Sequence, residues 1–406
     1  MYNESEVREA TLEYFGGDEL ATNVFITKYC LRDKEGNFVE KTPKDMHSRM
    51  ASEFARIEGK YGGPRALTEE KISEYFDNFK YIVPQGSPMM GIGNSYVNVS
   101  LSNCVVVESP SDNISSIINA GRDLANLFKR RCGVGLDLSD LRPDGTPVNN
   151  SAGTTTGAWS FADFYSYVCR MIGQNGRRGA LMITMDVRHP DIEEFVTMKR
   201  DLTKVTGANV SVKISDSFMQ AVQNNNKFTL QFPVDSDEPT YTKDIDAKAL
   251  WDVIVESATT TAEPGILMWD NIINNLPAHS YADDGFATIC TNPCAEIPLS
   301  AYDSCRLISI NLKNFVQSPF TGKAKFDFKK FTEVASAAMR LSDDLVDLEL
   351  EKLQSIIELA DTPDEKALWS KLYVAARDGR RTGLGTHGLA DALSCLNMGY
   401  DSDVGL

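Results

Sequence analysis

The segment TNPCAEIPLSAYDSCRLISINL, residues 291–312, carries side chains whose types and spacing are suited to catalysis. Asn292, Cys294 and Glu296 stand at alternate positions, so in an extended segment their side chains would point to the same side. An amide, a thiol and a carboxylate presented together beside a proline form a candidate catalytic cluster. Cys305 follows eleven residues after Cys294, which is too far for a CxxC redox or zinc pair.

Two alternatives compete with a catalytic role for these cysteines. A zinc site needs four Cys or His ligands, usually in close pairs. The four histidines, at positions 47, 189, 279 and 387, are not paired with the cysteines, and Cys290 with Cys294 would supply only half a site. We therefore expect no metal site. Free cysteines of cytosolic proteins are usually buried and unreactive. The residues alone therefore leave open that these cysteines are inert core residues.

Length and composition set the class of protein. The 406 residues, 42% hydrophobic and 24% charged, are enough for one large domain or two to three smaller ones. A net charge of −16 argues against a general nucleic-acid-binding protein, although local Lys/Arg clusters can still bind anionic small molecules. The sequence has no apolar run of roughly 18 residues, and its opening, MYNESEVREATLEYF, is not a signal peptide. With eight scattered cysteines, we expect a cytoplasmic protein without membrane or nucleic-acid partners.

The elements that must position the cluster change in character near residue 80. Before this point the sequence predicts helices, with Thr42 as N-cap, Pro43 in the first turn and Thr68 as the next N-cap. After it, short β-branched runs alternate with amphipathic helices, which is typical of parallel βα units. The predicted strands include NCVVVES, ALMITMD, ANVSVKI, FTLQF and RLISINL. We predict a helical N-terminal segment, residues 1–80, and an α/β body, residues 81–406.

Several motifs resemble the catalytic large subunit of ribonucleotide reductase. They are GSPMMGIG followed by LSNC, then KRRCGVGLDLSDLRPDG, GRRGALMITMDVRHPDIEEF, TNPCAEIPLSAYDSCRLISINL and RRTGLGTHGLADAL. Each is weak alone, but together they occur in the family's order and form a specific set. The resemblance implies an oxidoreductase that converts ribonucleotides, diphosphates in our expectation, to deoxyribonucleotides for DNA synthesis.

The resemblance also implies the fold. We expect an α/β protein in which a helical segment precedes the first half of a ten-stranded α/β barrel with a central finger loop. The chain ends about halfway through this pattern, so we expect either one piece of a split reductase or a fragment. The family's usual ATP-cone has no counterpart in the leader, which predicts that on–off regulation by that domain is lacking.

The resemblance implies a thiyl-radical mechanism. Cys294 looks like the radical cysteine that abstracts the 3′ hydrogen of the substrate, with Glu296 as general base and Asn292 at the ribose hydroxyls. Cys104 and Cys305 look like the redox-active pair that supplies two electrons and ends as a disulfide. Cys290 has no clear counterpart.

Substrate and effector residues are also implied. Ser87 matches a position that seats the substrate phosphate, and Asn103 adjoins the ribose. Asp112, Arg131 and Arg142 fall where the family binds a deoxynucleoside triphosphate or ATP as an allosteric effector, with Asp112 at the sugar and the arginines at the phosphates. For isolated residues, ordinary surface charge is the competing explanation.

The resemblance implies partners as well. We expect no cofactor bound in this chain and favour a radical supplied by a metal-containing small subunit, with adenosylcobalamin as the alternative. Expected partners are the ribonucleotide, deoxynucleotide effectors, the small subunit, the missing C-terminal half if the enzyme is split, a thioredoxin- or glutaredoxin-type reductant and a second large subunit in a homodimer.

A non-catalytic, nucleotide-binding regulatory homologue is the hypothesis from another class. Such a protein would have no need to keep the whole set of chemically active residues. The sequence retains all of them: Cys104, Asn292, Cys294, Glu296 and Cys305. We therefore favour the enzyme.

Overall fold

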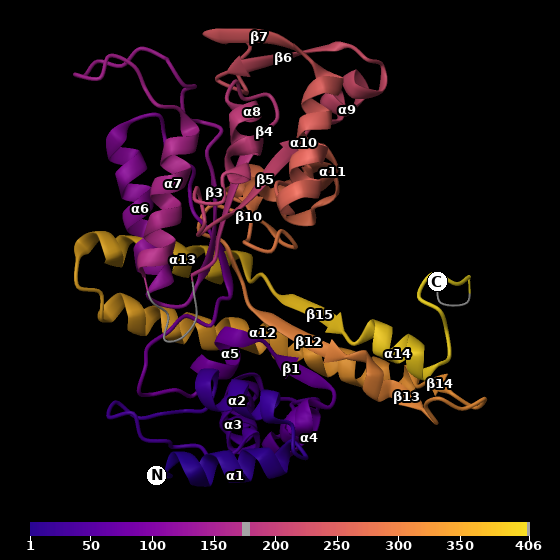
Figure 1. Cartoon of the computed structure of the whole chain (residues 1–406). Helices are drawn as coiled ribbons and strands as arrows, with labels where there is room; N and C mark the ends of the chain where they lie inside the picture. Colours follow the sequence, from indigo (N-terminus) through magenta and orange to yellow (C-terminus); the bar gives the residue numbers. More distant parts are fainter. Residues whose placement is uncertain (173–178, 404–406) are drawn as a thin grey trace. The chain divides into compact units, whose positions relative to one another are not determined.

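A computed structural model describes residues 1–172 and 179–403, so positions 176–178 of the GRRGALMITMDVRHPDIEEF motif lie outside the described residues. The chain divides into two compact units. Unit 1 comprises residues 1–103 and 305–406, and unit 2 comprises residues 104–304. Figure 1 shows the helices and strands of both and labels most of them.

Unit 1 joins the first helices of the chain to its last strands and helices. Its elements are α1 (Glu4–Tyr14), α2 (Glu19–Lys28), α3 (Pro43–Tyr61), α4 (Glu69–Phe76), η1 (Asp77–Phe79), β1 (Ile82–Pro84), α5 (Gly86–Gly91), β12 (Leu307–Asn311), η4 (Leu312–Phe315), β13 (Val316–Gln317), β14 (Lys325–Phe326), α12 (Phe328–Glu358), α13 (Pro363–Gly379), β15 (Gly383–His387) and α14 (Leu389–Cys395).

The helix boundaries in unit 1 follow from capping residues, as the sequence predicts. Thr42 precedes α3, Pro43 occupies its first turn, and Gly62 ends it with φ of 63°. Thr68 caps α4 by accepting a hydrogen bond from the Lys71 N–H at 3.3 Å. These two predicted helix starts are confirmed.

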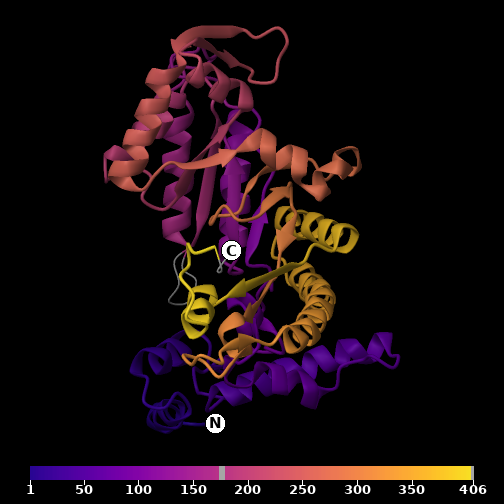
Figure 2. The same ribbon diagram turned by 90° about the vertical axis from the view of Figure 1, so that its right-hand side faces the viewer.

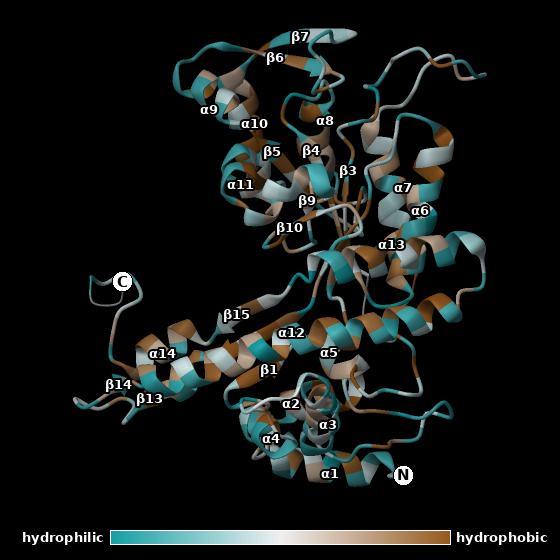
Figure 3. Ribbon diagram, turned by 180° about the vertical axis from the view of Figure 1, so that it is seen from behind, coloured by the Kyte–Doolittle hydropathy of each residue, from teal (hydrophilic) through white to brown (hydrophobic). Residues whose placement is uncertain are grey.

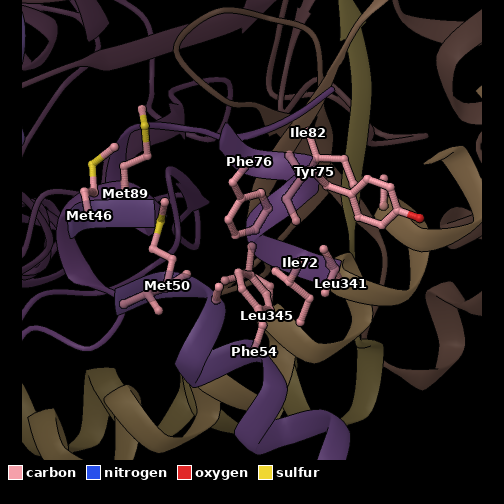
Figure 4. Close-up of a cluster of buried hydrophobic side chains, with 14 of the residues drawn as sticks. Met46, Met50, Phe54, Ile72, Tyr75, Phe76, Ile82, Met89, Leu341 and Leu345 are labelled. Carbon is pink, nitrogen blue, oxygen red and sulfur yellow. The ribbon is translucent and has the colours of Figure 1, made fainter. Parts of the chain in front are cut away.

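The core of unit 1 lies where α3 and α4 meet α12. Figure 4 shows Phe54 of α3 and Ile72 and Phe76 of α4 beside Leu341 and Leu345 of α12, and all five are buried. Burying one such side chain stabilises the fold by about 1.5–3 kcal/mol. Because the N-terminal helices share this core with a helix far along the chain, the predicted boundary at residue 80 does not coincide with the division between the two units.

A three-stranded sheet of unit 1 positions the first predicted site residues. β12 pairs antiparallel with β1 and parallel with β15. Figure 2 shows β15, in yellow, beside α12 seen nearly along its axis. Directly after β1, the Gln85 N–H donates to the Leu307 carbonyl at 2.9 Å, which anchors the start of the GSPMMGIG motif to β12.

Unit 2 carries alternating strands and helices. Its elements are β2 (Cys104–Val106), α6 (Ile114–Phe128), β3 (Gly133–Asp137), α7 (Ala158–Met171), β4 (Leu181–Asp186), α8 (Ile192–Thr197), η2 (Met198–Arg200), β5 (Asn209–Ile214), α9 (Asp216–Gln223), β6 (Lys227–Phe232), β7 (Tyr241–Asp246), α10 (Ala247–Thr261), β8 (Gly265–Met268), α11 (Trp269–Asn275), η3 (Pro277–Asp284), β9 (Thr288–Thr291) and β10 (Pro298–Ser300). The short β11 (Ser304–Cys305) spans the boundary between the units.

A parallel sheet forms the centre of unit 2. Its strands follow the order β2-β3-β4-β5-β8, and each neighbouring pair is parallel. Every residue of β3 and β4 is buried, as expected for strands covered on both faces. The predicted mixed α/β class, with a helical N-terminal segment followed by parallel strands, is confirmed.

The predicted strand FTLQF departs from the parallel pattern. It forms β6, which pairs antiparallel with β7 from Lys227 opposite Asp246 to Phe232 opposite Tyr241. Figure 3 shows β7 in teal and pale colours, consistent with its mostly exposed residues. This hairpin therefore stands apart from the parallel sheet because its outer strand has too little apolar surface to be buried on both faces.

Across residues 1–172 and 179–403, we find no helix with the length and apolar character needed to cross a membrane.

Candidate functional site

The predicted finger loop is the tip of a β-hairpin in unit 2. β9 and β10 pair antiparallel, with Cys290 opposite Leu299 and Thr291 opposite Pro298. We call residues 292–297, which connect the two strands, the finger tip.

The finger tip is a turn and not an extended segment. The Ala295 N–H donates to the Asn292 carbonyl at 3.0 Å, and Ala295 has a left-handed φ of 68°. The Asn292 side chain closes the turn by accepting the Ile297 N–H at Oδ1, also at 3.0 Å. The expectation that Asn292, Cys294 and Glu296 point to one side is therefore wrong, because the left-handed residue interrupts the alternation of an extended chain.

Burial divides the three residues. Asn292 is fully buried, whereas Cys294 and Glu296 are exposed. The other seven cysteines of the chain are all buried. The tip thus presents one thiol and one carboxylate outward and holds its amide inward.

The buried amide of Asn292 connects the finger tip to Cys104. Its Nδ2 donates to the Cys104 sulfur at 3.1 Å, while its Oδ1 accepts the bond from Ile297. Two predicted site residues from distant motifs therefore lie in contact. A hydrogen bond to sulfur also fixes where the Cys104 side chain points.

Backbone contacts hold the hairpin against the parallel sheet. Asn209, the first residue of β5, donates from Nδ2 to the Pro293 carbonyl at 2.9 Å, directly before Cys294. Gly135 of β3 lies so close to the hairpin that a Cβ there would collide with the Thr291 carbonyl. The hairpin can approach β3 this closely only because position 135 has no side chain.

A buried ion pair lies beneath the hairpin and was not predicted from the sequence. Lys213 of β5 and Asp137 of β3 are 2.8 Å apart, and the Lys213 ammonium lies 3.4 Å from the Ile289 carbonyl of β9. Burial alone would lower the pKa of Lys213, but the nearby carboxylates raise it. The sequence did contain a signal for this ion pair, since Asp137 and Lys213 each stand in a largely apolar strand. Charged residues in such positions are rarely buried without a partner.

Cys290 lies next to this ion pair. Burial and the negative charge of Asp137 raise the pKa of its thiol to about 12. Its S–H donates to the Thr291 carbonyl at 3.1 Å. These features are typical of a protonated core cysteine and favour an inert role for Cys290.

Unit 1 contains Ser87, Asn103 and Cys305, three of the predicted site residues. The Asn103 N–H donates to the Cys305 carbonyl at 3.0 Å. Cys305 is buried against β15, where a Cβ at Gly383 would collide with its sulfur. Ser87 Oγ and Asn103 Oδ1 are buried and have no hydrogen-bond partner among the described residues. Such groups are costly unless a ligand or water satisfies them.

A cavity of about 500 Å³ in unit 2 contains two of the predicted effector residues. Asp112, before α6, and Arg142, after β3, both line it, with Asn149, Thr155 and Phe161 among the other lining residues. Arg142 Nε donates to Asp112 Oδ2 at 2.7 Å, and Nη1 donates to the Pro147 carbonyl at 3.1 Å. Since a guanidinium has five N–H donors, this arrangement leaves capacity for an anionic ligand.

Arg131 is placed differently. It is buried after α6 with φ of 72°, and its N–H donates to the Phe128 carbonyl. Within the described part of the chain, it is not among the residues that line the cavity. Its role as an effector ligand stays a prediction.

No group of three or more His, Cys, Asp or Glu residues suited to holding a metal ion occurs in the described ranges.

Comparison with known proteins adds to this geometry. The family model described as "Ribonucleotide reductase, barrel domain" matches residues 102–406. The vitamin B12-dependent ribonucleoside-diphosphate reductase of Mycobacterium tuberculosis is 31% identical over 388 residues, which cover 94% of this chain and 51% of that protein. The protein of the same name from Thermoplasma acidophilum is 28% identical over 439 residues, covering 94% of this chain and 53% of that protein. The ribonucleoside-diphosphate reductase large chain of Neurospora crassa is 27% identical over 331 residues, with coverage of 75% and 33%.

The fold and the site define a mixed α/β protein with an exposed cysteine at the tip of a hairpin that rests on a parallel sheet. With the barrel-domain match over residues 102–406, the chain belongs to the ribonucleotide reductase family. It spans about half the length of the two vitamin B12-dependent relatives.

The comparisons correct two expectations. We favoured a metal-containing small subunit as the radical source, and this is wrong because relatives that align with most of the chain are named vitamin B12-dependent. The radical-generating small subunit expected among the partners is wrong for the same reason.

Proposed function

We propose that this chain is the part of an adenosylcobalamin-dependent ribonucleoside-diphosphate reductase that carries the radical cysteine. Family membership and the names of the relatives support this proposal. Because the chain spans about half of those relatives, the activity belongs to the complete reductase of which this chain forms a part.

The finger tip supplies the radical and the base. In the proposed mechanism Cys294 becomes a thiyl radical and abstracts the 3′ hydrogen of the ribose. Glu296, exposed on the same tip, accepts the 3′-hydroxyl proton. Both side chains are accessible to a nucleotide without rearrangement of the hairpin, which supports these roles.

Cys104 and Cys305 supply the reducing equivalents. The ribose loses its 2′-oxygen as water and gains hydrogen at that carbon. The two thiols give up two electrons and two protons and become a disulfide, so the overall reaction balances. Asn292, which donates to the Cys104 sulfur, would hold this thiol in position for the transfer.

Ser87 and Asn103 would contact the substrate from unit 1. The unsatisfied oxygens of both side chains support this role, since a phosphate or ribose hydroxyl would provide the missing partners. A phosphate oxygen accepts from the Ser87 hydroxyl, and a ribose hydroxyl donates to Asn103 Oδ1.

The proposed cofactor fits the accessibility of the radical cysteine. Adenosylcobalamin supplies radical chemistry when bound. A bulky cofactor that acts as the radical source can reach an exposed thiol but not a buried one. Cys294 is the exposed cysteine of this chain.

The cavity at Asp112 and Arg142 would bind a deoxynucleoside triphosphate as effector. The Arg142 guanidinium and the amide and hydroxyl groups of the walls suit phosphate and sugar oxygens. Arg131 would assist only if the region after α6 rearranges on binding.

The observation that carries the proposal is the exposed Cys294 on a tip whose amide contacts Cys104. The test is the formation of deoxycytidine diphosphate by the complete reductase containing this chain, with adenosylcobalamin and a dithiol. Cys294→Ser removes the S–H bond that a radical can occupy, so turnover should disappear while nucleotide binding, measured by calorimetry, stays intact.

The matched control is Cys395→Ala, which changes a buried cysteine with no proposed role and should retain activity. Appreciable product from Cys294→Ser would overturn the assignment of the radical residue.

A further inference from the structure

The RHPDIEEF part of the third motif has no role in the function proposed above, yet it lies directly behind the effector cavity. His189 and Asp191 belong to the segment that connects β4 to α8. Figure 1 labels both of these elements. Both are buried, and neither lines the cavity in the described part of the chain. Their hydrogen bonds run to the backbone of the segments that do.

Asp191 joins the two walls of the cavity. Its carboxylate accepts the Asp144 N–H, at 3.0 and 3.1 Å from the two oxygens, and the Ala158 N–H at 3.2 Å. Asp144 follows Arg142 by two positions, and Ala158 begins α7, two positions after the lining residue Thr156. One side chain therefore fixes both segments relative to each other.

The glycine between these walls makes the contact possible. Gly157 has φ of 76°, which favours glycine, and a Cβ there would lie 2.8 Å from Asp191 Oδ2. The buried Asp191 carboxylate can therefore approach the backbone at position 157 only because this residue is glycine.

His189 holds the residue on the other side of Arg142. The Asp191 N–H donates to His189 Nδ1 at 3.1 Å, so Nδ1 is an acceptor and the ring proton resides on Nε2. Nε2 then donates to the Leu141 carbonyl at 2.7 Å. Burial lowers the pKa of this imidazole, in keeping with the neutral tautomer. Leu141 and Asp144, which bracket Arg142, are therefore both fixed by the motif.

We infer that His189 and Asp191 are positioning residues for the effector cavity: they hold the backbone on both sides of Arg142 and fix it to the wall that begins α7. The inference rests on the proposed effector role of this cavity. A guanidinium binds a phosphate well only when its N–H groups are oriented toward the phosphate oxygens. A shift of the Arg142 backbone therefore weakens effector binding even though every side chain that binds the effector is still present.

The test is calorimetric titration of dTTP, dGTP and dATP into the complete reductase containing this chain and into its variants. Asp191→Asn leaves only one acceptor oxygen for two N–H groups, and affinity for the bound nucleotide should fall about tenfold, the effect of losing one hydrogen bond to a charged group. His189→Ala should give a similar loss. His189→Gln, whose amide can still donate to the Leu141 carbonyl, should restore most of the affinity.

Asp163→Asn is the matched control for general destabilisation. The Asp163 carboxylate also accepts a backbone N–H, that of Val205 at 3.0 Å, but Asp163 does not line the cavity. This variant should lower the thermal unfolding midpoint and leave nucleotide affinity unchanged. If Asp191→Asn does not fold, judged by circular dichroism, the comparison of His189→Gln with His189→Ala decides the question.

The outcomes separate this inference from the proposed function. Wild-type affinity in Asp191→Asn and His189→Ala, together with weakened binding in Arg142→Ala, overturns the positioning role alone. Absence of binding by the wild-type reductase overturns the effector site itself, and this inference with it.

Discussion

Asn209 holds the backbone directly before Cys294, the proposed radical cysteine. Its amide donates to the Pro293 carbonyl at 2.9 Å, and the preceding residue, Asn292, donates to the Cys104 sulfur at 3.1 Å. At the residue scale, the position of Cys294 therefore depends on amides that do not themselves react. A radical abstraction is sensitive to displacements of a fraction of an ångström, so such supports affect rate more than binding.

Replacing Asn209 by Ala should loosen the finger tip. The lost hydrogen bond would lower kcat about threefold to tenfold, within the range expected for one partly exposed bond, and leave KM unchanged. Alkylation of Cys294 by iodoacetamide should become faster, because the thiol samples more orientations.

The control for this experiment is Asn224→Ala, an exposed asparagine that ends α9. It should match the wild type in both measurements. Equal alkylation rates in Asn209→Ala and the wild type would contradict a positioning role for Asn209.

Much of the candidate site could be predicted from residue types, but its supports could not. The motifs singled out Asn292, Cys294 and Glu296. Of the three expected effector residues, Asp112 and Arg142 line one cavity, whereas Arg131 is not among the described residues that line it. They did not indicate that Asn292 turns inward, because the left-handed conformation at Ala295 has no signature in a residue that normally avoids it. Side-chain contacts to backbone carbonyls, such as that of Asn209, depend on the tertiary fold. They produce no recognisable motif or residue spacing in the sequence.

At the element scale, the packing of α3 on α12 buries two acidic side chains together. Glu58 of α3 pairs with Arg340 of α12, and Asp344 lies one turn further along the same helix. Burial and the adjacent Glu58 carboxylate raise the pKa of Asp344 well above its usual value, whereas Arg340 and Asp343 act on it more weakly. Asp344 therefore favours its protonated form in the folded protein.

This pair should make the unfolding free energy depend on pH. The folded protein binds the Asp344 proton more tightly than the unfolded chain, so the stabilisation is complete below the usual aspartate pKa of about 4 and is lost as pH rises through the folded value. Burial would raise the pKa of Glu58, but hydrogen bonds from Arg340 and the Leu67 N–H outweigh it and lower this pKa, so Glu58 does not reverse the trend between pH 5 and pH 8. In urea unfolding, the wild type should lose more stability between pH 5 and pH 8 than Asp344→Asn. A parallel decline in both proteins would show that another group is responsible.

The elements themselves were predicted unevenly, for physical reasons. The starts of helices α3 and α4 are recognisable in the sequence from the N-cap residues Thr42 and Thr68 and from Pro43 in the first turn of α3. The strands of the parallel sheet are short apolar runs, and their existence was predictable. Their pairing was not: a run such as FTLQF reads the same whether its neighbour is a parallel strand or, as in β6, the exposed antiparallel β7.

At the scale of the whole molecule, the proposed reductant is divided between the units. Cys104 belongs to unit 2 and Cys305 to unit 1, and each is buried. The division follows from chain topology, since the chain leaves unit 2 after Ser304 and continues into β12, which pairs with β1 and β15. A disulfide between these cysteines would join the two units covalently.

One turnover of the complete reductase without external reductant should leave Cys104 and Cys305 joined by a disulfide. Peptide mapping under non-reducing conditions measures this directly, with Cys294→Ser as the control in which no bond forms. Recovery of both cysteines as thiols after turnover, or of Cys305 linked to Cys290, would mean that the reductant is misassigned.

The close approach of the finger hairpin to Gly135 also limits how this sequence can diverge over evolutionary time. Any larger residue at position 135 would push back the Thr291 backbone, and Asn292 with its contact to Cys104 would move with it. Such a substitution can be inherited only if the hairpin changes in compensation. Substitutions in the strand at 133–137 and in the segment at 290–292 are therefore expected to occur together. A mutational scan should find position 135 among the positions of the chain that tolerate substitution least.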